Sequence, residues 1–311
     1  MLIVALLAIN IYIFIMTSSE TPRWEIPEGY YESVATSSPS RFLHWAGRMA
    51  VAPLRFAQYG SSVVDTTAEF DRYQTSGTFA SGNIIMTLTH RSALETVFHP
   101  AVLESLGLHH ARPISKLDSN MENRVKRWGM HKLGAFAVDK RRPDVRGIAH
   151  AQKGILSRNG IMSVYVEGTR IYQNIDSVAN VELGAVIAAI QNDSLIIPQA
   201  SAGLSKEKRL DEQGHLIEVA RDQKAPFGRS PKNFLKKGLP VVHAFGDPFR
   251  LPIPDFPFSL ERGHGAKNFR RSKDFAHDAS ILVGKAMQRT LDRAYELRGS
   301  KLEDVLREDL L

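Results

Sequence analysis

The chain contains no cysteine among its 311 residues. This absence excludes disulfide bonds, thiolate nucleophiles and metals held by thiolates. The sequence also has neither a Gly-x-Ser-x-Gly elbow nor a Walker phosphate-binding loop. Gly263 and Gly265 begin a dinucleotide-binding pattern, but Asn268 stands where its third glycine belongs. Serine hydrolases, nucleoside triphosphatases and dinucleotide-dependent enzymes therefore all lose support.

The charge of the chain is positive but dispersed. Lys and Arg number 40 against 33 Asp and Glu, which gives a net charge of +7. An excess this small does not form a nucleic-acid-binding stripe, so we expect no nucleic-acid partner. An anionic membrane surface or a phosphorylated substrate fits better. Histidines such as His109, His110 and His131 lack metal-ligand spacing with carboxylates, so we expect no bound metal.

The amino terminus is apolar from residue 2 to residue 16, interrupted only by Asn10. As a helix this run would rise roughly 22 Å, against a hydrocarbon core of roughly 30 Å. Residues 17–19 extend it close to the length of a span. A cleaved secretory signal is the less favoured alternative, since no basic n-region precedes the run and no small-residue cleavage site is clear. We therefore expect residues 1–19 to form a transmembrane or membrane-anchor helix.

Composition divides the rest of the chain into three parts. Residues 20–39 are rich in Ser, Thr, Pro and Glu and are predicted to be a linker. Residues 40–80 are predicted to be an amphipathic helical segment, which either packs against the domain or lies on a bilayer through its arginines. Residues 81–311 are predicted to form one large catalytic domain, because a chain of this length suits a single core.

Short apolar runs alternate with longer helical patterns from residue 83 onward. This alternation predicts an α/β fold with a substantially parallel central sheet flanked by helices. The expected strands are 83–88, 134–138, 161–166, 195–200 and 240–245. The expected helices are 92–107, 119–130, 144–158, 179–191 and 274–297. Active sites of such sheets lie beyond the carboxyl ends of the strands, where the segments that begin at His90 and Glu167 fall.

The segment Thr89-His90-Arg91-Ser92-Ala93-Leu94-Glu95 is the first candidate for chemistry. Positions five apart on one helix are rotated by about 140°, so His90 and Glu95 share no helix face. They meet only if His90 lies in the loop before the helix. Ser92 favours this arrangement, because Ser92 and Glu95 match a helix capping box. The same match leaves open a simpler interpretation, in which Glu95 only caps the helix.

This segment resembles the first motif of the glycerolipid acyltransferase superfamily, the 1-acylglycerol-3-phosphate acyltransferases and their relatives. In that family a histidine is followed after four residues by an acid, which is aspartate in most members, so Glu95 is a departure. Further blocks follow in the family's order between residues 83 and 250. The family's most recognisable string is Glu167-Gly168-Thr169-Arg170, and the other blocks are Gly134 to Arg141, Leu195 to Pro198 and Phe245 to Pro248.

The resemblance implies that His90 is the general base of acyl transfer and that Glu95 orients it. The acceptor hydroxyl would attack the acyl thioester directly, without a covalent enzyme intermediate. The donor would be acyl-CoA or acyl carrier protein as a co-substrate, with no other cofactor. We expect the catalytic domain on the cytoplasmic side of the membrane, because acyl donors are made there.

The resemblance also implies a phosphate-binding group of basic residues. Arg170 would bind the phosphate of the acceptor, supplemented by Lys140 and Arg141. An alternative for Arg170 is a structural ion pair with Glu167 or Asp139. Glu167 would hold the loop, and two neighbours would shape it: Gly168 by close backbone approach or a positive φ, and Thr169 by binding the loop backbone.

The preferred acceptor is a lysophospholipid, 1-acylglycerol 3-phosphate, which would give phosphatidic acid. Glycerol 3-phosphate or another lysolipid is the alternative within the class. Outside the class, the chain could be a catalytically silent membrane-binding protein with the same fold. It could also be a hydrolase in which His90 activates water, and this last case predicts free fatty acid without any acceptor.

Overall fold

The three-dimensional structure is a computed structural model. It describes residues 24–40, 62–90, 95–116, 124–139, 141, 144–168, 177–178, 180–203, 206–210, 216–220, 241–260 and 266–308. The helices are α2 (Tyr30–Thr36), α4 (Ala68–Thr75), the 3₁₀ helix η1 (Thr78–Ser81), α5 (Glu95–Ser105), α7 (Arg124–Lys132), α8 (Val145–Leu156), α9 (Leu183–Asn192) and α11 (Ala266–Glu308). The strands are β1 (Ser62–Asp65), β2 (Ile84–Leu88), β3 (Arg112–Lys116), β4 (Phe136–Val138), β5 (Ile161–Tyr165), β6 (Leu195–Ala202), β7 (Lys206–Leu210), β8 (Leu216–Ala220), β9 (Val241–Phe245) and β10 (Phe249–Arg250).

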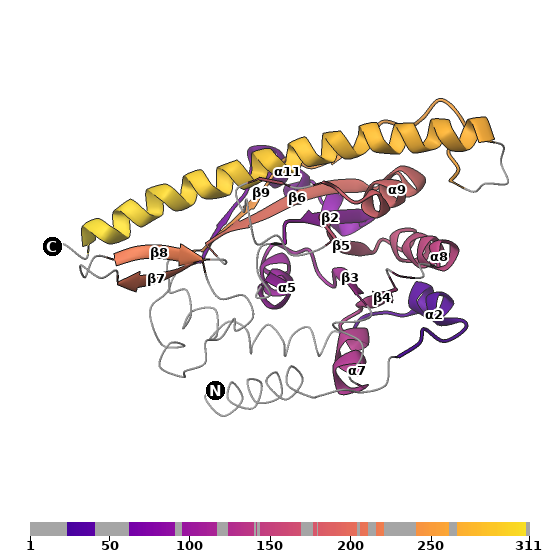
Figure 1. Ribbon diagram of the computed structural model, residues 1–311, viewed down its shortest axis with the longest axis horizontal. Helices are drawn as coiled ribbons and strands as arrows, with labels where there is room; N and C mark the ends of the chain where they lie inside the picture. Colours follow the sequence, from indigo (N-terminus) through magenta and orange to yellow (C-terminus); the bar gives the residue numbers. More distant parts are fainter. Residues whose placement is uncertain are drawn as a thin grey trace.

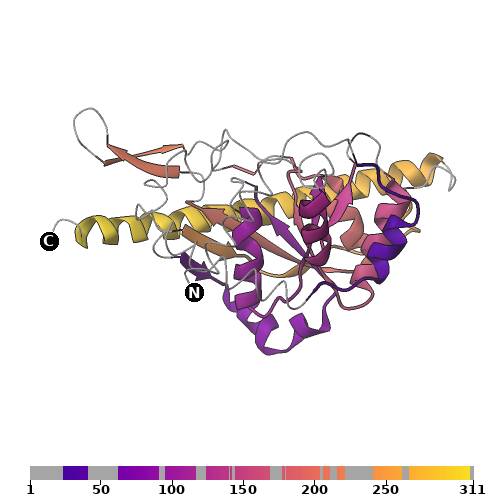
Figure 2. The same cartoon turned by 90° about the horizontal axis from the view of Figure 1, so that it is seen from below.

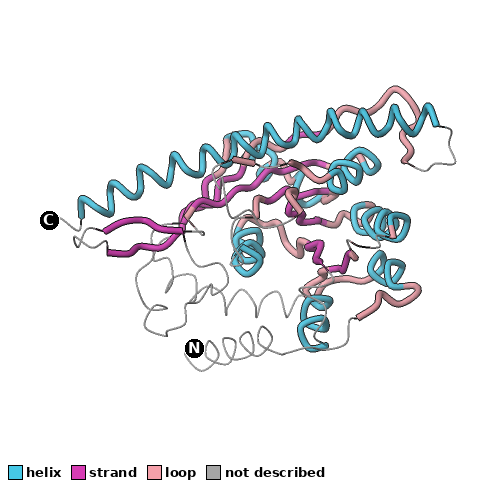
Figure 3. The backbone as a smooth tube through the Cα atoms, viewed as in Figure 1, coloured by secondary structure: helices cyan, strands magenta, loops and turns pink. Residues whose placement is uncertain are grey.

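The central sheet is mixed but mostly parallel. Its strand order is β1-β9-β6-β2-β5-β3-β4, and β10 pairs with β6 at one end of that strand. The neighbours from β6 to β4 are all parallel, whereas β9 runs antiparallel to β6 and carries β1 parallel to itself. The predicted α/β fold with a substantially parallel central sheet is thus confirmed, and Figure 3 shows the helices that flank the strands.

Strand β2 shows why the sheet forms at this place. Its sequence Ile-Ile-Met-Thr-Leu is buried at every position, as expected for a strand covered on both faces. Ile84, Met86 and Leu88 pack against the side that carries α4, η1 and α5, whereas Ile85 packs against α8, α9 and α11. This alternation puts a core on each face of the sheet.

Helix α11 crosses the sheet along β6 and β9, at the top of Figure 1. It is longer at both ends than the predicted helix 274–297. Thr87 donates a hydrogen bond to Met287 Sδ, which ties the centre of α11 to β2. Seen from below in Figure 2, α11 extends beyond the sheet at its carboxyl end.

The predicted strands 83–88, 134–138, 161–166, 195–200 and 240–245 correspond to β2, β4, β5, β6 and β9. The sequence pattern does not predict β1, β3 or β10. The polar segment 205–238 contains the β7–β8 hairpin, whose strands pair only with each other among the described residues.

The predicted linker at residues 20–39 requires a correction. Part of it forms α2, in which Tyr30, Tyr31 and Val34 are buried. The two tyrosine hydroxyls bond to the backbone of Ala137 on β4, so this segment belongs to the folded domain. The composition is typical of a linker, but the two aromatic side chains are large enough to hold a short helix on the sheet.

The prediction of an amphipathic helical segment at residues 40–80 is also wrong at residues 62–65, although residues 68–75 are helical. Ser62–Asp65 is strand β1, which pairs with β9 at the edge of the sheet, and α4 and η1 follow it. The domain therefore begins before residue 81. Residues 41–61 lie outside the described residues.

The membrane-anchor prediction for residues 1–19 also lies outside the described residues. Within the described ranges, no helix is both long enough and apolar enough to cross a bilayer.

Candidate active site

The carboxyl ends of β2 and β5 lie side by side at the candidate site, next to β6. Leu88, near the carboxyl end of β2, pairs with Tyr165 on β5 and with Gln199 on β6. His90 follows β2 by two residues and Glu167 follows β5 by two residues. Because parallel strands end at the same edge of a sheet, residues 77 positions apart meet here.

His90 and Glu95 form the pair that the sequence predicts. His90 Nδ1 lies 3.2 Å from Glu95 Oε2. Glu95 is the first residue of α5 and its side chain is fully buried, whereas the His90 side chain is 14% exposed. His90 therefore lies in the loop before the helix, and the contact fixes one ring nitrogen while the ring keeps an exposed side. Ser92 and its capping interaction lie outside the described residues.

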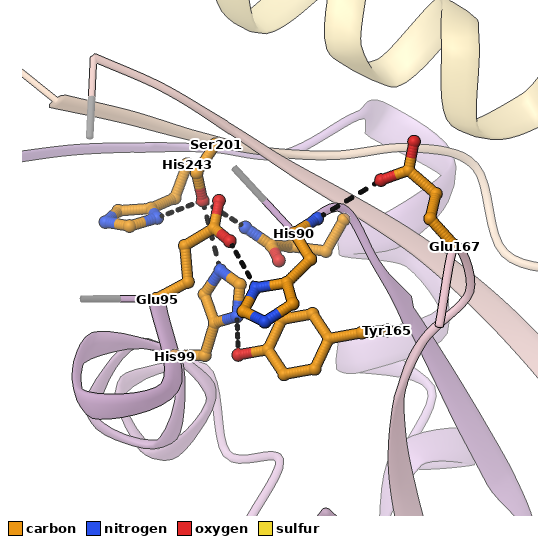
Figure 4. Close-up of polar contacts among 8 residues, drawn as sticks. His90, Glu95, His99, Tyr165, Glu167, Ser201 and His243 are labelled. Atoms are coloured by element: carbon orange, nitrogen blue, oxygen red, sulfur yellow. Dashed lines mark hydrogen bonds and ion pairs between the residues drawn. The ribbon is translucent and has the colours of Figure 1, made fainter. Parts of the chain in front are cut away.

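Glu167 contacts the same loop from the next strand. Its Oε2 accepts a hydrogen bond of 3.3 Å from the backbone N–H of His90, and the residue is 5% exposed. Glu167 thus holds the His90 backbone and points away from the imidazole (Figure 4). Gly168 follows with a φ of 62°, a left-handed conformation that glycine adopts without strain.

A ring stack that the sequence analysis did not predict lies beneath His90. The rings of His90 and Tyr165 are 4.1 Å apart between centroids and inclined by 26°. The Tyr165 hydroxyl lies 3.2 Å from His99 Nδ1, on the same helix as Glu95 (Figure 4). His99 follows Glu95 by four residues, which places both on one face of α5. That spacing is the signal in the sequence by which His99 could have been found.

The hydrogen bonds continue from His99 into the sheet. His99 Nε2 lies 3.1 Å from Ser201 Oγ, and Ser201 Oγ lies 2.8 Å from His243 Nδ1. The Gln199 amide donates to Ser201 Oγ at 2.9 Å. We call Tyr165, His99, Gln199, Ser201 and His243 the buried polar network. The strand register explains it, because Ser201 on β6 pairs with His243 on β9.

Burial disfavours the charged forms of His99 and Tyr165. Desolvation, followed by the neighbouring His243 and His90, lowers the pKa of His99 well below its ordinary 6.5. Desolvation, followed by the Glu95 carboxylate, raises the pKa of Tyr165 well above its ordinary 10.0. At neutral pH His99 and Tyr165 are therefore neutral hydrogen-bonding groups next to the buried side chain of Glu95.

The predicted phosphate-binding residues are only partly described. Lys140, Thr169 and Arg170 lie outside the described residues. Arg141 is exposed, and its backbone N–H donates to Asp139 Oδ1 at 2.9 Å just beyond β4. The sheet order places β3 and β5 between β4 and β2. The structure thus brings together His90, Glu95, Glu167 and Gly168, whereas Arg141 follows a strand at the sheet edge.

The described residues can do general-base chemistry. His90 Nε2 makes no hydrogen bond within the described ranges, and the buried carboxylate on Nδ1 holds the opposite nitrogen ready to take a proton. Over these ranges, no group of three or more His, Asp or Glu side chains is arranged to hold a metal ion.

Similarity to known proteins covers part of the chain in a family model and most of it in a solved structure. Residues 68–202 match the family model described as Acyltransferase. No curated protein matches the chain. Among solved structures, the chain is similar to the 1-acyl-sn-glycerophosphate (LPA) acyltransferase PlsC from Thermotoga maritima, with 12% sequence identity and a TM-score of 0.44 over 90% of this chain and 89% of that chain.

Proposed function

We propose that the chain, whose residues 68–202 match the family model described as Acyltransferase, moves a fatty acyl group from an acyl thioester to a hydroxyl of a lysophospholipid. The proposed acceptor is 1-acylglycerol 3-phosphate, and the product is phosphatidic acid. The observation that carries this proposal is the 3.2 Å contact between His90 Nδ1 and the buried Glu95 carboxylate at the carboxyl end of β2.

The proposed mechanism is direct acyl transfer. His90 Nε2 takes the proton of the acceptor hydroxyl while the oxygen attacks the thioester carbonyl carbon. Glu95 Oε2 accepts the hydrogen bond of Nδ1–H and stabilises the imidazolium that forms. The tetrahedral intermediate then collapses, the carbon–sulfur bond breaks, and the thiolate takes the proton from Nε2. A new ester and a free thiol result, and His90 is again neutral.

The phosphate of the acceptor is proposed from the string Glu167-Gly168-Thr169-Arg170. A planar guanidinium suits bidentate binding of phosphate, so we assign this role to Arg170, with Lys140 and Arg141 as further cations. The position of Glu167 supports a loop-holding role, since its carboxylate already accepts from the His90 backbone. The acceptor would therefore bind beside the loop that carries the base.

A membrane location completes the proposal. We propose that residues 1–19 anchor the chain and that the catalytic domain faces the cytoplasm. Support comes from the apolar run of residues 2–16 and from the low water solubility of a two-chain lipid product.

The test is an acceptor panel assayed with one acyl-CoA and, in parallel, one acyl carrier protein donor. The full chain is mixed with 1-acylglycerol 3-phosphate, glycerol 3-phosphate, lysophosphatidylcholine or monoacylglycerol, and the lipid products are identified by mass spectrometry. We expect phosphatidic acid from the first acceptor and none with His90→Ala. A preference for glycerol 3-phosphate would contradict the proposed acceptor. Release of fatty acid without any acceptor would indicate a hydrolase. If no acyl group is transferred or released, the proposed acyltransferase activity is wrong.

The same panel tests the phosphate assignment. Arg170→Ala should lower kcat/KM for 1-acylglycerol 3-phosphate by about ten- to hundredfold, the loss expected for one charge-assisted contact. Monoacylglycerol, which has no phosphate, serves as the matched acceptor and should be affected much less. Arg170→Lys should restore part of the loss, because it keeps the charge without the planar fork. An equal loss for both acceptors would remove phosphate binding from Arg170.

A further inference from the structure

The orientation of the His90 ring needs more than its contact with Glu95. A single hydrogen bond at Nδ1 fixes one atom of the imidazole and leaves the ring plane free to swing about that atom. A base must hold its nitrogen within hydrogen-bond reach of the acceptor hydroxyl, and small misplacements are costly. The ring stack with Tyr165 supplies the missing restraint, because a flat contact at 4.1 Å fixes the plane.

We propose that Tyr165 is a positioning residue for His90, and that His99, Ser201 and His243 act through Tyr165 by holding its hydroxyl. The inference rests on the proposed role of His90 as the general base. It assigns the same task to two contacts, with Glu95 setting the position of Nδ1 and Tyr165 setting the plane that aims Nε2.

One helix carries the anchors of both contacts. Glu95 and His99 lie four residues apart on α5, and both are buried, with exposed fractions of 0% and 3%. Glu95 reaches His90 directly, whereas His99 reaches it through the Tyr165 hydroxyl. Because α5 joins these two anchors rigidly, the ring is fixed relative to one helix and the ends of two strands.

Ser201 connects His99 to His243 within the network. A hydroxyl has one donor and two acceptor sites, and Ser201 Oγ has three partners: the Gln199 amide, His99 Nε2 and His243 Nδ1. Since the amide donates, one histidine must donate to the hydroxyl and the other must accept from it. Either arrangement leaves His99 Nδ1 able to pair with Tyr165, as an acceptor in one case and a donor in the other.

This saturation also excludes a different role for Ser201. Every hydrogen-bonding site of its hydroxyl is taken within the buried network, and the residue is 1% exposed. It is therefore placed as a structural partner of two histidines, and acyl transfer through a serine ester does not fit.

Charge favours the stack as well. When His90 takes a proton, its ring becomes a cation lying on the face of Tyr165, which is an attractive arrangement. Tyr165 remains a neutral phenol throughout, since burial raises its pKa well above the ordinary value. The tyrosine can thus hold the base in both protonation states.

The test compares kcat, KM and melting temperature for Tyr165→Leu and Tyr165→Phe in the full chain, with 1-acylglycerol 3-phosphate and acyl-CoA. Phe keeps the ring and loses the hydroxyl, whereas Leu loses the stack. We expect Tyr165→Leu to lower kcat about ten- to hundredfold with KM within about threefold, and Tyr165→Phe, which keeps the stack but loses the contact with His99, to lower kcat only about three- to tenfold.

Tyr31→Leu is the matched control. Tyr31 is also buried, at 4% exposure, and its hydroxyl also bonds to a partner far along the chain, but it lies in α2 and contacts β4. Loss of this ring should lower the melting temperature and leave kcat at its normal value below that temperature. If Tyr165→Leu behaves like Tyr31→Leu, Tyr165 only fills the core.

A second variant keeps the proposal open to contradiction if Tyr165→Leu does not fold. His99→Leu removes both hydrogen bonds of the anchor and leaves the Tyr165 ring, so kcat should fall about three- to tenfold with little change in KM. Normal kcat in a folded His99→Leu protein would overturn the anchoring role.

His90→Ala separates failure of the proposed base from failure of the proposed positioning. An active His90→Ala protein contradicts the role of His90 as the base. An inactive His90→Ala protein together with a fully active Tyr165→Leu protein contradicts only the positioning role of Tyr165.

Discussion

Two buried polar groups of this molecule use their hydrogen bonds in opposite ways. Arg112, on β3 and 4% exposed, donates to the backbone carbonyls of Gly134, Val34 and Ser37 and to the Ser37 hydroxyl. The buried polar network around His99 consists almost entirely of contacts between side chains, and it ends at the ring of His90.

The difference suggests different roles for the two groups: Arg112 stabilises the fold, whereas the buried polar network serves the proposed base. Three of the four hydrogen bonds of Arg112 go to main-chain carbonyls, those of Val34 and Ser37 in and after α2 and that of Gly134 before β4, so this arginine holds distant segments together. Burial, with a smaller contribution from Arg158, lowers its pKa to about 10, which leaves it charged at neutral pH. The network around His99 joins no new segment to the fold, since α5, β5, β6 and β9 already share one hydrophobic cluster, and its proposed effect is on the orientation of His90.

The comparison predicts that changes near His90 alter activity and that changes at Arg112 alter stability. The largest effect on activity is expected at Glu95. Glu95→Gln keeps the volume of the side chain but removes the negative charge that stabilises the imidazolium. We expect kcat to fall between roughly tenfold and 10⁴-fold, the upper end being the loss seen when the orienting acid of a triad becomes an amide. The melting temperature should change little, because Gln still suits the start of a helix.

Glu95→Asp sharpens the same point. Aspartate is the residue that most members of the resembled family carry, and it should keep substantial activity if the loop before α5 shifts to restore the contact with His90. Steady-state kinetics and thermal melts of the three proteins distinguish the roles. A fully active Glu95→Gln protein would mean that Glu95 only caps α5.

The second effect is expected in stability alone. Arg112→Met keeps an apolar stem of similar length and removes the guanidinium donor from the buried carbonyls of Gly134 and Val34 and from the partly buried carbonyl of Ser37. The free energy of unfolding should fall by roughly 2–4 kcal/mol, measured by urea denaturation, because unpaired buried polar groups are costly. Below the melting temperature, kcat should stay within about twofold of normal.

Arg158→Met is the matched control for Arg112. Arg158 also donates to a carbonyl of the α2 segment, that of Thr36, at 2.9 Å, but Arg158 is exposed. Its loss should cost less than about 1 kcal/mol, as is usual for surface contacts. Equal costs for the two variants would contradict the view that Arg112 fastens the α2 segment.

Much of the sheet could be predicted because its strands are apolar at consecutive positions. β2 and β6 are buried along their whole length, and such runs bounded by turns are a strong local signal. Helix α2 carries no comparable signal. Its seven residues are too short for a periodic pattern, and its stability comes from contacts with residues about 75 to 107 positions away, such as Arg112 and Ala137.

In the candidate site, too, contacts between residues close in sequence could be predicted, whereas contacts between distant residues could not. His90 and Glu95 are close in sequence, and their spacing within a recognisable motif predicts the contact. Tyr165, Ser201 and His243 come together only through the strand order and register, with separations of 66 positions from His99 to Tyr165 and 42 from Ser201 to His243. A single sequence without its sheet topology does not contain that information, although His99 could have been suspected from its position four residues after Glu95.

The smallest expected effect concerns the pH dependence of stability. His99 has a pKa well below 6.5 in the folded protein, because of burial first and the nearby His243 and His90 second. The unfolded chain therefore takes up a proton at His99 near pH 6.5 while the folded chain does not, so the unfolding free energy falls as the pH drops below that value. One such proton corresponds to at most about 1.4 kcal/mol per pH unit.

Melting curves between pH 7.5 and 5 test this expectation. The melting temperature of His99→Gln should fall less steeply with decreasing pH than that of the unaltered chain, even if the variant is less stable at every pH. His131→Gln should flatten the curve less, since the pKa of this half-buried histidine is also lowered, by burial and then by Arg127, but not as far. If the slope of His99→Gln equals that of the unaltered chain, His99 takes up its proton without cost, and the neutral state assigned to His99 is wrong.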